Sequence, residues 1–155
     1  MERKILISAC LIGENVKYDG GNNALHVKIL EAWKEQGILV SLCPEVLGEL
    51  SVPRPPCEVI EGTNKVICKT GEDVSEAFAK GARESLKIAK ENDVCMAILK
   101  ARSPSCGKDI IYDGTFTSTR VNDSGLTCKL LQENGIMVFS EEELVLAEAF
   151  WKQKG

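Results

Sequence analysis

The chain has 155 residues, 44% hydrophobic and 27% charged, which is enough apolar material for the core of one domain. Its 23 acidic and 19 basic residues give a formal charge of −4, which argues against a nucleic-acid or membrane-surface binder. The chain has seven cysteines and one histidine. A single histidine argues against a histidine-rich zinc site, and an odd cysteine count excludes a disulfide set that uses every cysteine.

The start of the chain has no features of a targeting segment. The first four residues carry charges of both signs, and the apolar run that follows is short and contains Ser8 and Cys10. No run approaches the roughly 18 apolar residues that span a bilayer. We therefore expect a cytoplasmic protein, in which cysteines stay reduced and are buried apolar side chains, reactive thiols or metal ligands.

Taken in chain order, the hydrophobic patterns predict alternating strands and helices. The predicted elements are a strand at 4–9, a helix at 24–36 with Asn23 as its N-cap, a strand at 38–42, a hairpin at 58–69, a helix at 74–92, a strand at 94–100, a helix at 126–134, a strand at 136–139 and a closing helix at 141–151. Three prolines exclude regular structure at 51–56, and residues 112–115 read as a loop rich in glycine and threonine.

The four main strands are apolar throughout, which is typical of a parallel sheet covered on both faces. We therefore predict a three-layer α/β fold. It has a Rossmann-like, mostly parallel sheet, helices on both faces and a small β-hairpin insertion. A single domain spans residues 1–155.

Three cysteines, Cys10, Cys43 and Cys106, follow the carboxyl ends of predicted strands. Ligands bind at that edge of open parallel sheets. Three thiolates with one open position suit a four-iron cluster with a free iron, or zinc with a bound water. The alternative is that each is simply a buried cysteine. We favour a site because all three share one edge. We expect the others to be structural: Cys57, Cys68, Cys95 and Cys128.

Polar residues beside these cysteines suggest catalysis. Glu45 is a candidate general base or a solvated loop residue. Ser103 and Ser105 sit in a proline-stiffened turn that can aim a hydroxyl at the site, although serine is common in turns. Arg54 can hold an anionic or carbonyl group of a substrate, or pair with a carboxylate. The absence of a Gly-x-Ser-x-Gly motif and of a spare histidine argues against a hydrolase triad.

Seven motifs together resemble the thiouracil desulfidase family of bacteria and archaea, from Ile5 to about Glu141. They are Ser8-Ala-Cys-Leu-Ile-Gly13, Val16-Lys-Tyr-Asp-Gly-Gly21, Cys43-Pro-Glu-Val46, Pro53-Arg-Pro-Pro56, Ala97-Ile-Leu-Lys100, Ser103-Pro-Ser-Cys-Gly107 and Ile111-Tyr-Asp-Gly-Thr-Phe116.

The resemblance implies a [4Fe-4S] cluster held by Cys10, Cys43 and Cys106, with one open iron, and a catalytic pair of Glu45 and Ser103. It also implies non-redox removal of sulfur from a thiocarbonyl compound such as 2-thiouracil, with the open iron acting as a Lewis acid. The expected partners are a thioamide or thiolated pyrimidine substrate and, transiently, the iron–sulfur assembly machinery, with no membrane or nucleic acid.

One alternative function is a non-enzymatic carrier of sulfide or iron–sulfur clusters, which needs the three cysteines but neither Glu45 nor Ser103. A zinc-bound structural module and a thiol redox protein are further alternatives. The lack of a C-x-x-C pair argues against the redox protein.

Overall fold

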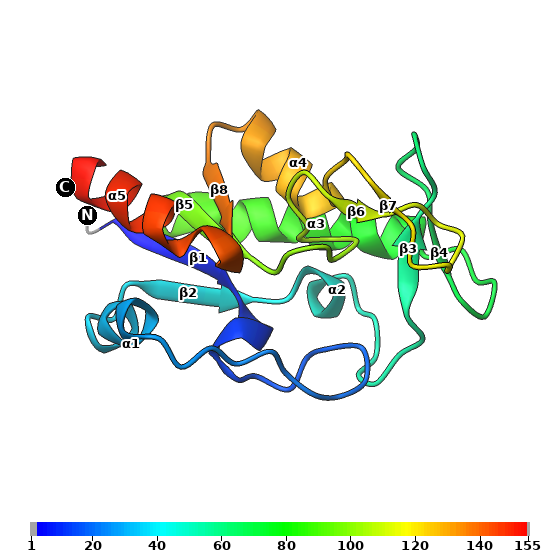
Figure 1. Cartoon of the computed structure of the whole chain (residues 1–155), viewed down its shortest axis with the longest axis horizontal. Coiled ribbons are helices and arrows are strands. Elements are labelled where there is room, and N and C mark those ends of the chain that lie inside the picture. The colour runs from blue at the N-terminus through cyan, green and yellow to red at the C-terminus, as the bar shows by residue number, and fades with distance from the viewer. Residues whose placement is uncertain (1–2, 155) are drawn as a thin grey trace.

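The computed structural model describes residues 3–154. Its central sheet has four parallel strands in the order β2–β1–β5–β8 (Figure 1). The strands are β1 (Lys4–Ser8), β2 (Leu39–Leu42), β5 (Val94–Leu99) and β8 (Met137–Ser140). This confirms the predicted parallel sheet and its four strands. Only the strand ends differ, by one residue.

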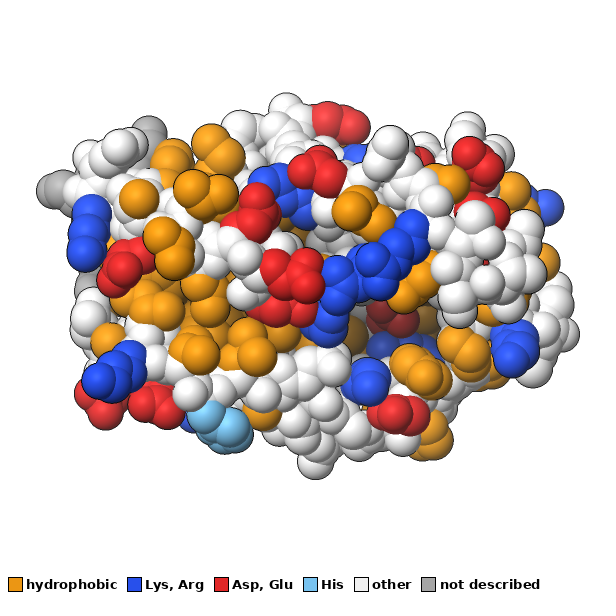
Figure 2. All heavy atoms as spheres, viewed as in Figure 1, with side chains coloured by type: hydrophobic (Ala, Val, Ile, Leu, Met, Phe, Trp, Pro, Cys, Tyr) orange, Lys and Arg blue, Asp and Glu red, His pale blue; other side chains and the backbone are white. Residues whose placement is uncertain are grey.

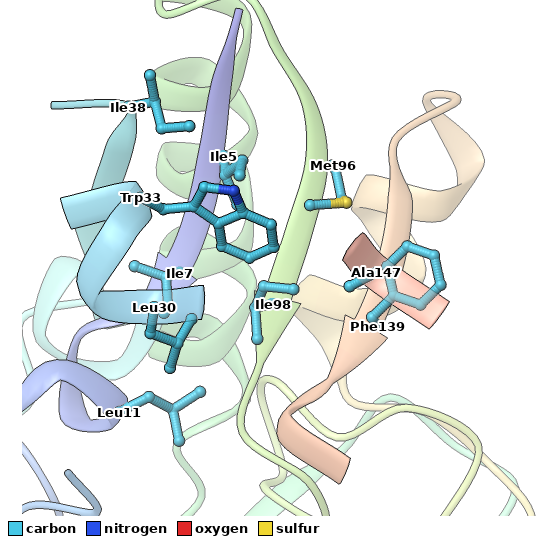
Figure 3. Packing of buried hydrophobic residues seen from close by; sticks show 10 residues of the cluster. All are labelled: Ile5, Ile7, Leu11, Leu30, Trp33, Ile38, Met96, Ile98, Phe139 and Ala147. Atoms are coloured by element: carbon cyan, nitrogen blue, oxygen red, sulfur yellow. The ribbon is translucent and has the colours of Figure 1, made fainter. Parts of the chain in front are cut away.

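Helices cover both faces of this sheet. They are α1 (Lys28–Glu35) and α5 (Leu144–Lys154) on one face and α3 (Ser75–Glu91) and α4 (Leu126–Glu133) on the other. The strand pleat explains the division. Ile5 and Ile7 pack with Trp33 of α1 (Figure 3), whereas Leu6 belongs to the same cluster as Leu131 of α4 on the other face. Each such fully buried aliphatic side chain stabilises the fold by about 1.5–3 kcal/mol. The predicted three-layer α/β architecture is therefore confirmed.

Shorter elements join these layers. They are η1 (Ala9–Ile12), α2 (Pro44–Leu47), β3 (Cys57–Val59), β4 (Val66–Cys68), β6 (Ile111–Tyr112), β7 (Arg120–Val121) and η2 (Glu141–Glu143). The predicted hairpin is β3–β4, and it packs against Phe78 near the start of α3. The loop predicted at 112–115 begins at the end of the first strand of a second short antiparallel pair, β6–β7, which the sequence analysis did not predict. Both hairpins lie together at one end of the molecule (Figure 1).

The first helix begins four residues later than predicted. Residues 23–25 are held to η1, because the N–H groups of Asn23 and Leu25 donate to the carbonyls of Cys10 and Leu11 at 2.9 Å. These two bonds fix the backbone of residues 23–25 against η1, and residues 21–27 lie outside any helix or strand. Val27, in an extended conformation, precedes the helix, so the assignment of Asn23 as N-cap was wrong. Within residues 3–154 no helix is long and apolar enough to cross a bilayer.

Candidate active site

A cavity of about 480 Å³ lies at the carboxyl ends of β2, β1 and β5. Cys10 belongs to η1 directly after β1, Cys43 directly follows β2, and Cys106 lies in the turn after β5. All three cysteines line this one cavity although 33 and 63 residues separate them along the chain. Figure 2 shows a hollow on this face with Lys and Arg side chains along its rim. The sequence-based expectation that one sheet edge gathers these residues agrees with this placement.

The short helix α2 sets the position of Cys43 and Glu45, and it crosses α3 with almost no gap. A β-carbon added at Gly48 would overlap the carbonyl of Ala77, and one added at Gly81 would overlap the carbonyl of Pro44. Only glycine at both positions allows the two backbones to approach this closely. The positions of Cys43 and Glu45 therefore depend on this close glycine contact between α2 and α3.

We expect Gly81→Ala to lower both stability and the ability to hold a metal cluster. Alanine favours a helix by about 0.5–1 kcal/mol over glycine. Overpacking costs about 1–3 kcal/mol, so the clash with Pro44 should dominate. Thermal unfolding and bound iron after anaerobic reconstitution measure the two effects. Lys87→Ala, on the exposed side of α3, is the matched control. A stabilised Gly81→Ala protein with full iron content would contradict this account.

Polar groups act on the three cavity cysteines against the effect of burial. Burial raises the pKa of Cys10 and Cys43, whereas the Asn23 side chain and the backbone N–H of Val46 act to lower it. Cys106 is only 3% exposed, and the Oγ of Ser105 lies 3.7 Å from its sulfur. Hydrogen bonds to sulfur tune iron–sulfur centres, and they stabilise a thiolate over a thiol.

Burial nevertheless raises the pKa of all three thiols above the ordinary value for cysteine. The proximity of Cys43 raises the pKa of both Cys10 and Cys106 further. Three thiolates gathered in a partly buried cavity therefore need a cation to compensate their charge. This donor set fits a sulfur-ligated metal centre.

The spacing of these groups differs from that of a single-ion site. Across residues 3–154, no three His, Cys, Asp or Glu side chains are grouped as ligands of one metal ion.

Glu45 lines the cavity and is held there by two hydrogen bonds. Its Oε1 accepts a hydrogen bond from Arg54 Nε at 3.0 Å, and its Oε2 accepts one from Ser105 Oγ at 2.9 Å. The side chains of Glu45 and Arg54 are only 13% and 5% exposed. Glu45 is therefore not a solvated loop residue.

The structure distinguishes the roles of the two serines of the Ser-Pro-Ser-Cys turn. Ser105 touches Glu45 directly, and its Oγ also lies 3.7 Å from Cys106 Sγ. Ser103 lies one step further, with its Oγ 3.1 Å from that of Ser105. The backbone N–H groups of Ser105 and Cys106 both donate to Ser103 Oγ, at 3.2 and 3.0 Å. The three side chains form one chain, Ser103–Ser105–Glu45.

Arg54 forms hydrogen bonds to several segments of the cavity wall. Besides its bond to Glu45, its guanidinium donates to the carbonyls of Ser51 and Val16 at 3.1 and 2.9 Å. Its backbone N–H donates to the carbonyl of Tyr18 at 2.7 Å. Of the two roles considered for Arg54, the structure shows pairing with a carboxylate. The proline-rich segment positions it for that pairing.

Several cavity residues carried no signal as site residues in the sequence. Ser8 is the polar end of a buried apolar strand, and its Oγ accepts from the N–H of Lys100 at 2.9 Å. Lys100 also pairs with Glu141 at 2.9 Å. The sequence analysis missed Ser8, which ends an apolar strand two residues before Cys10. Tyr18 and Tyr112, each of which precedes an Asp-Gly turn, also line the cavity.

The four cysteines expected to be structural fall into two groups. Cys95 and Cys128 pack in the hydrophobic clusters on opposite faces of the sheet. Cys57 lines the cavity, and Cys68 lies beside it in β4.

The fold and this cavity define an α/β protein with a cysteine-lined site at the carboxyl edge of its parallel sheet. The model of the 2-thiouracil desulfurase family matches residues 5–143, so the chain belongs to this family. The solved structure of the [4Fe-4S]-dependent thiouracil desulfidase TudS is similar, with a TM-score of 0.90 and 38% identity. That match covers 96% of this chain and 99% of TudS.

A curated relative also matches over most of its length. "Uncharacterized protein YbbK" of Bacillus subtilis (strain 168) is 41% identical over 148 residues, which covers 90% of this chain and 97% of that protein. The similarity to TudS and YbbK thus extends across nearly the full length of each protein.

Proposed function

We propose that this protein is an iron–sulfur-dependent desulfidase that converts a thiocarbonyl compound such as 2-thiouracil, with water, to uracil and sulfide. The observation that supports this proposal most directly is that one cavity is lined by Cys10, Cys43 and Cys106 together with the hydrogen-bonded pair of Glu45 and Ser105. Membership of the 2-thiouracil desulfurase family and the similarity to TudS support the same activity.

We assign Cys10, Cys43 and Cys106 as the three ligands of a [4Fe-4S] cluster that leaves one iron without a protein ligand. When bound, the cluster supplies a Lewis acid that binds sulfur and polarises a C=S bond. The Oγ of Ser105 lies 3.7 Å from the sulfur of Cys106. The reaction needs no net electron transfer, because a C=S group and water give a C=O group and hydrogen sulfide.

Glu45 is the proposed general base. Its Oε2 already accepts the proton of Ser105, and Ser105 is in contact with Ser103. A proton can therefore pass from Ser103 Oγ to Ser105 Oγ while the Ser105 proton passes to Glu45. The alternative is that Glu45 takes a proton from an attacking water that Ser103 orients.

Two features of Ser103 favour its participation. Two backbone N–H groups donate to its Oγ, and such donors stabilise negative charge that develops on an oxygen. Its own proton is free to point towards Ser105. Arg54, by holding Glu45 Oε1, keeps the other carboxylate oxygen aimed at the serines.

The proposed substrate is a small thioamide or thiolated pyrimidine, because a cavity of about 480 Å³ is within the size range of small-molecule sites. We also propose a cytoplasmic location and transient contact with the iron–sulfur assembly machinery, which a protein with reduced thiols and an oxygen-sensitive centre requires.

Anaerobic reconstitution with iron and sulfide tests the function. We expect a brown protein with about four irons per chain, as the cluster type demands. With 2-thiouracil it should release uracil and sulfide in equal amounts. A zinc-loaded protein is the control and should be colourless and inactive. Full activity in a colourless protein without iron would overturn the proposal.

A further inference from the structure

Cys57 and Cys68 form a close thiol pair beside the cavity. They are register partners across β3 and β4, and their Sγ atoms are 3.0 Å apart with no disulfide between them. The mechanism proposed above uses neither residue.

The hydrogen bonds of the hairpin define the geometry of this pair. Lys69 N donates to Pro56 O, and Ile60 N donates to Lys65 O, both at 2.9 Å. Hydrogen-bonded and non-hydrogen-bonded pairs alternate along an antiparallel ladder, so Cys57 and Cys68 occupy a non-hydrogen-bonded position. Cα atoms at such positions are about 4.5 Å apart, at the short end of the roughly 4.4–6.8 Å range of disulfides. The backbone can therefore accept a disulfide without changing register.

The two thiols differ in their access to solvent. Cys57 is half-buried and lines the cavity, so a small molecule that enters the cavity can reach it. Cys68 is only 4% exposed and lies behind Cys57. This arrangement resembles the division between an attacking thiol and a resolving thiol.

We propose that Cys57 and Cys68 are a reversible dithiol–disulfide pair, oxidised by low-molecular-weight disulfides such as oxidised glutathione. The Cys57 thiolate attacks one sulfur of the small disulfide, which forms a mixed disulfide and releases one small thiolate. Cys68, deprotonated as it reacts, then attacks the Cys57 sulfur, which forms the Cys57–Cys68 bond and releases the second thiolate. The two released thiolates take up the two cysteine protons. The protein loses two electrons, and the small disulfide gains them.

Oxidation of the pair changes the chemistry of the cavity wall. The dithiol state presents a fourth cavity thiol in addition to Cys10, Cys43 and Cys106. In the disulfide state Cys57 can neither bind a metal ion as a thiolate nor react with an electrophile. The hairpin keeps its register in both states, because the sulfurs need to approach only about 1 Å more closely.

Oxidised glutathione added anaerobically to the iron-loaded protein tests the pair. Free thiols are blocked with an alkylating reagent and cross-linked peptides are identified by mass spectrometry. Burial and the adjacent Cys68 raise the pKa of Cys57, so the reaction is run at mildly alkaline pH. We expect loss of two thiols per chain and one cross-linked peptide, Cys57 to Cys68, that reduced dithiothreitol reverses.

Two variants separate the steps. Cys68→Ser should retain glutathione on Cys57, because the resolving thiol is gone, and Cys57→Ser should lose at least about tenfold in reaction rate because Cys68 is buried. Cys95→Ser, which changes a half-buried cysteine of β5, is the control and should behave like the wild type. Stable glutathione on Cys57 in the wild type, or an unchanged rate in Cys57→Ser, would overturn the proposal.

The same measurement on protein without added iron keeps the test separate from the proposed desulfidase activity. The Cys57–Cys68 link should form there too. Cross-links that join only Cys10, Cys43 or Cys106, with Cys57 and Cys68 still free, would refute the pair whatever the activity of the loaded enzyme.

Discussion

Cys106→Ala is expected to remove bound iron and 2-thiouracil turnover together. Cys106 is 3% exposed in the cavity wall, where the Oγ of Ser105 lies 3.7 Å from its sulfur, and alanine leaves no atom there to bind iron. Even changes to residues that only support metal ligands cost about 10–100-fold. We therefore expect more than about a 100-fold loss for the ligand itself. Cys10→Ala and Cys43→Ala should behave in the same way.

The measurements are iron and sulfide content, the visible absorbance of the reconstituted protein and turnover of 2-thiouracil. Cys95→Ala is a matched control, because Cys95 is a half-buried cysteine that packs against the core cluster on one face of the sheet. It should keep both iron and activity. Thermal unfolding of the apo proteins distinguishes ligand loss from misfolding. A Cys106→Ala protein with full iron content and wild-type turnover would refute the ligand assignment.

Glu45→Gln is expected to keep the cluster and lose turnover by about 10²–10⁴-fold, the range for removal of a general base. Glutamine has nearly the same shape, so it still fills the site beside Ser105. It cannot take up a proton as a carboxylate does. Because Arg54 is 5% exposed and loses its charged partner, we also expect a stability loss, of up to about 3–5 kcal/mol.

The control for this variant is Glu49→Gln. Glu49 is 77% exposed, pairs with Lys80 at 2.7 Å and lies just after α2. Its substitution should leave iron content, stability and turnover unchanged, because exposed ion pairs contribute little. Turnover must be measured at a temperature where Glu45→Gln is folded. Wild-type activity in Glu45→Gln would favour the carrier alternative, which does not need this carboxylate.

The two serines can be separated by the same assay. Ser103→Ala should retain the cluster and lower kcat, because the proposed proton path begins at its hydroxyl. Ser105→Ala should also lower kcat, because it removes the link between Ser103 and Glu45. Unchanged kcat in Ser103→Ala would remove Ser103 from the catalytic pair.

Local patterns predicted most of the fold correctly. The buried strands, the long amphipathic helix α3 and the hairpin β3–β4 all appear within a few residues of the predicted limits. These elements follow from hydrophobic periodicity and turn residues, which act over short distances in the chain. The helix start at Lys28 did not follow from them. Residues 23–25 instead bond to η1, a contact that no local pattern encodes.

The candidate site was predictable in part for the same reason. Cys10, Cys43 and Cys106 each follow a strand, and parallel strands share one carboxyl edge. That the three cysteines line one cavity was therefore predictable from the sequence. Which hydroxyl touches Glu45 could not be expected, because Ser103 and Ser105 are separated by one residue and occupy the same turn.

The sequence by itself determined the α/β class, the three cysteines at strand ends and the family motifs. The tertiary structure alone decided that Arg54 and Ser105 hold Glu45, that Gly81 sets the position of α2, and that Cys57 faces Cys68. The physical reason is the distance along the chain over which each effect acts. Periodicity and turn preferences act between near neighbours, whereas hydrogen bonds and thiol contacts depend on side-chain directions that only the packed fold fixes.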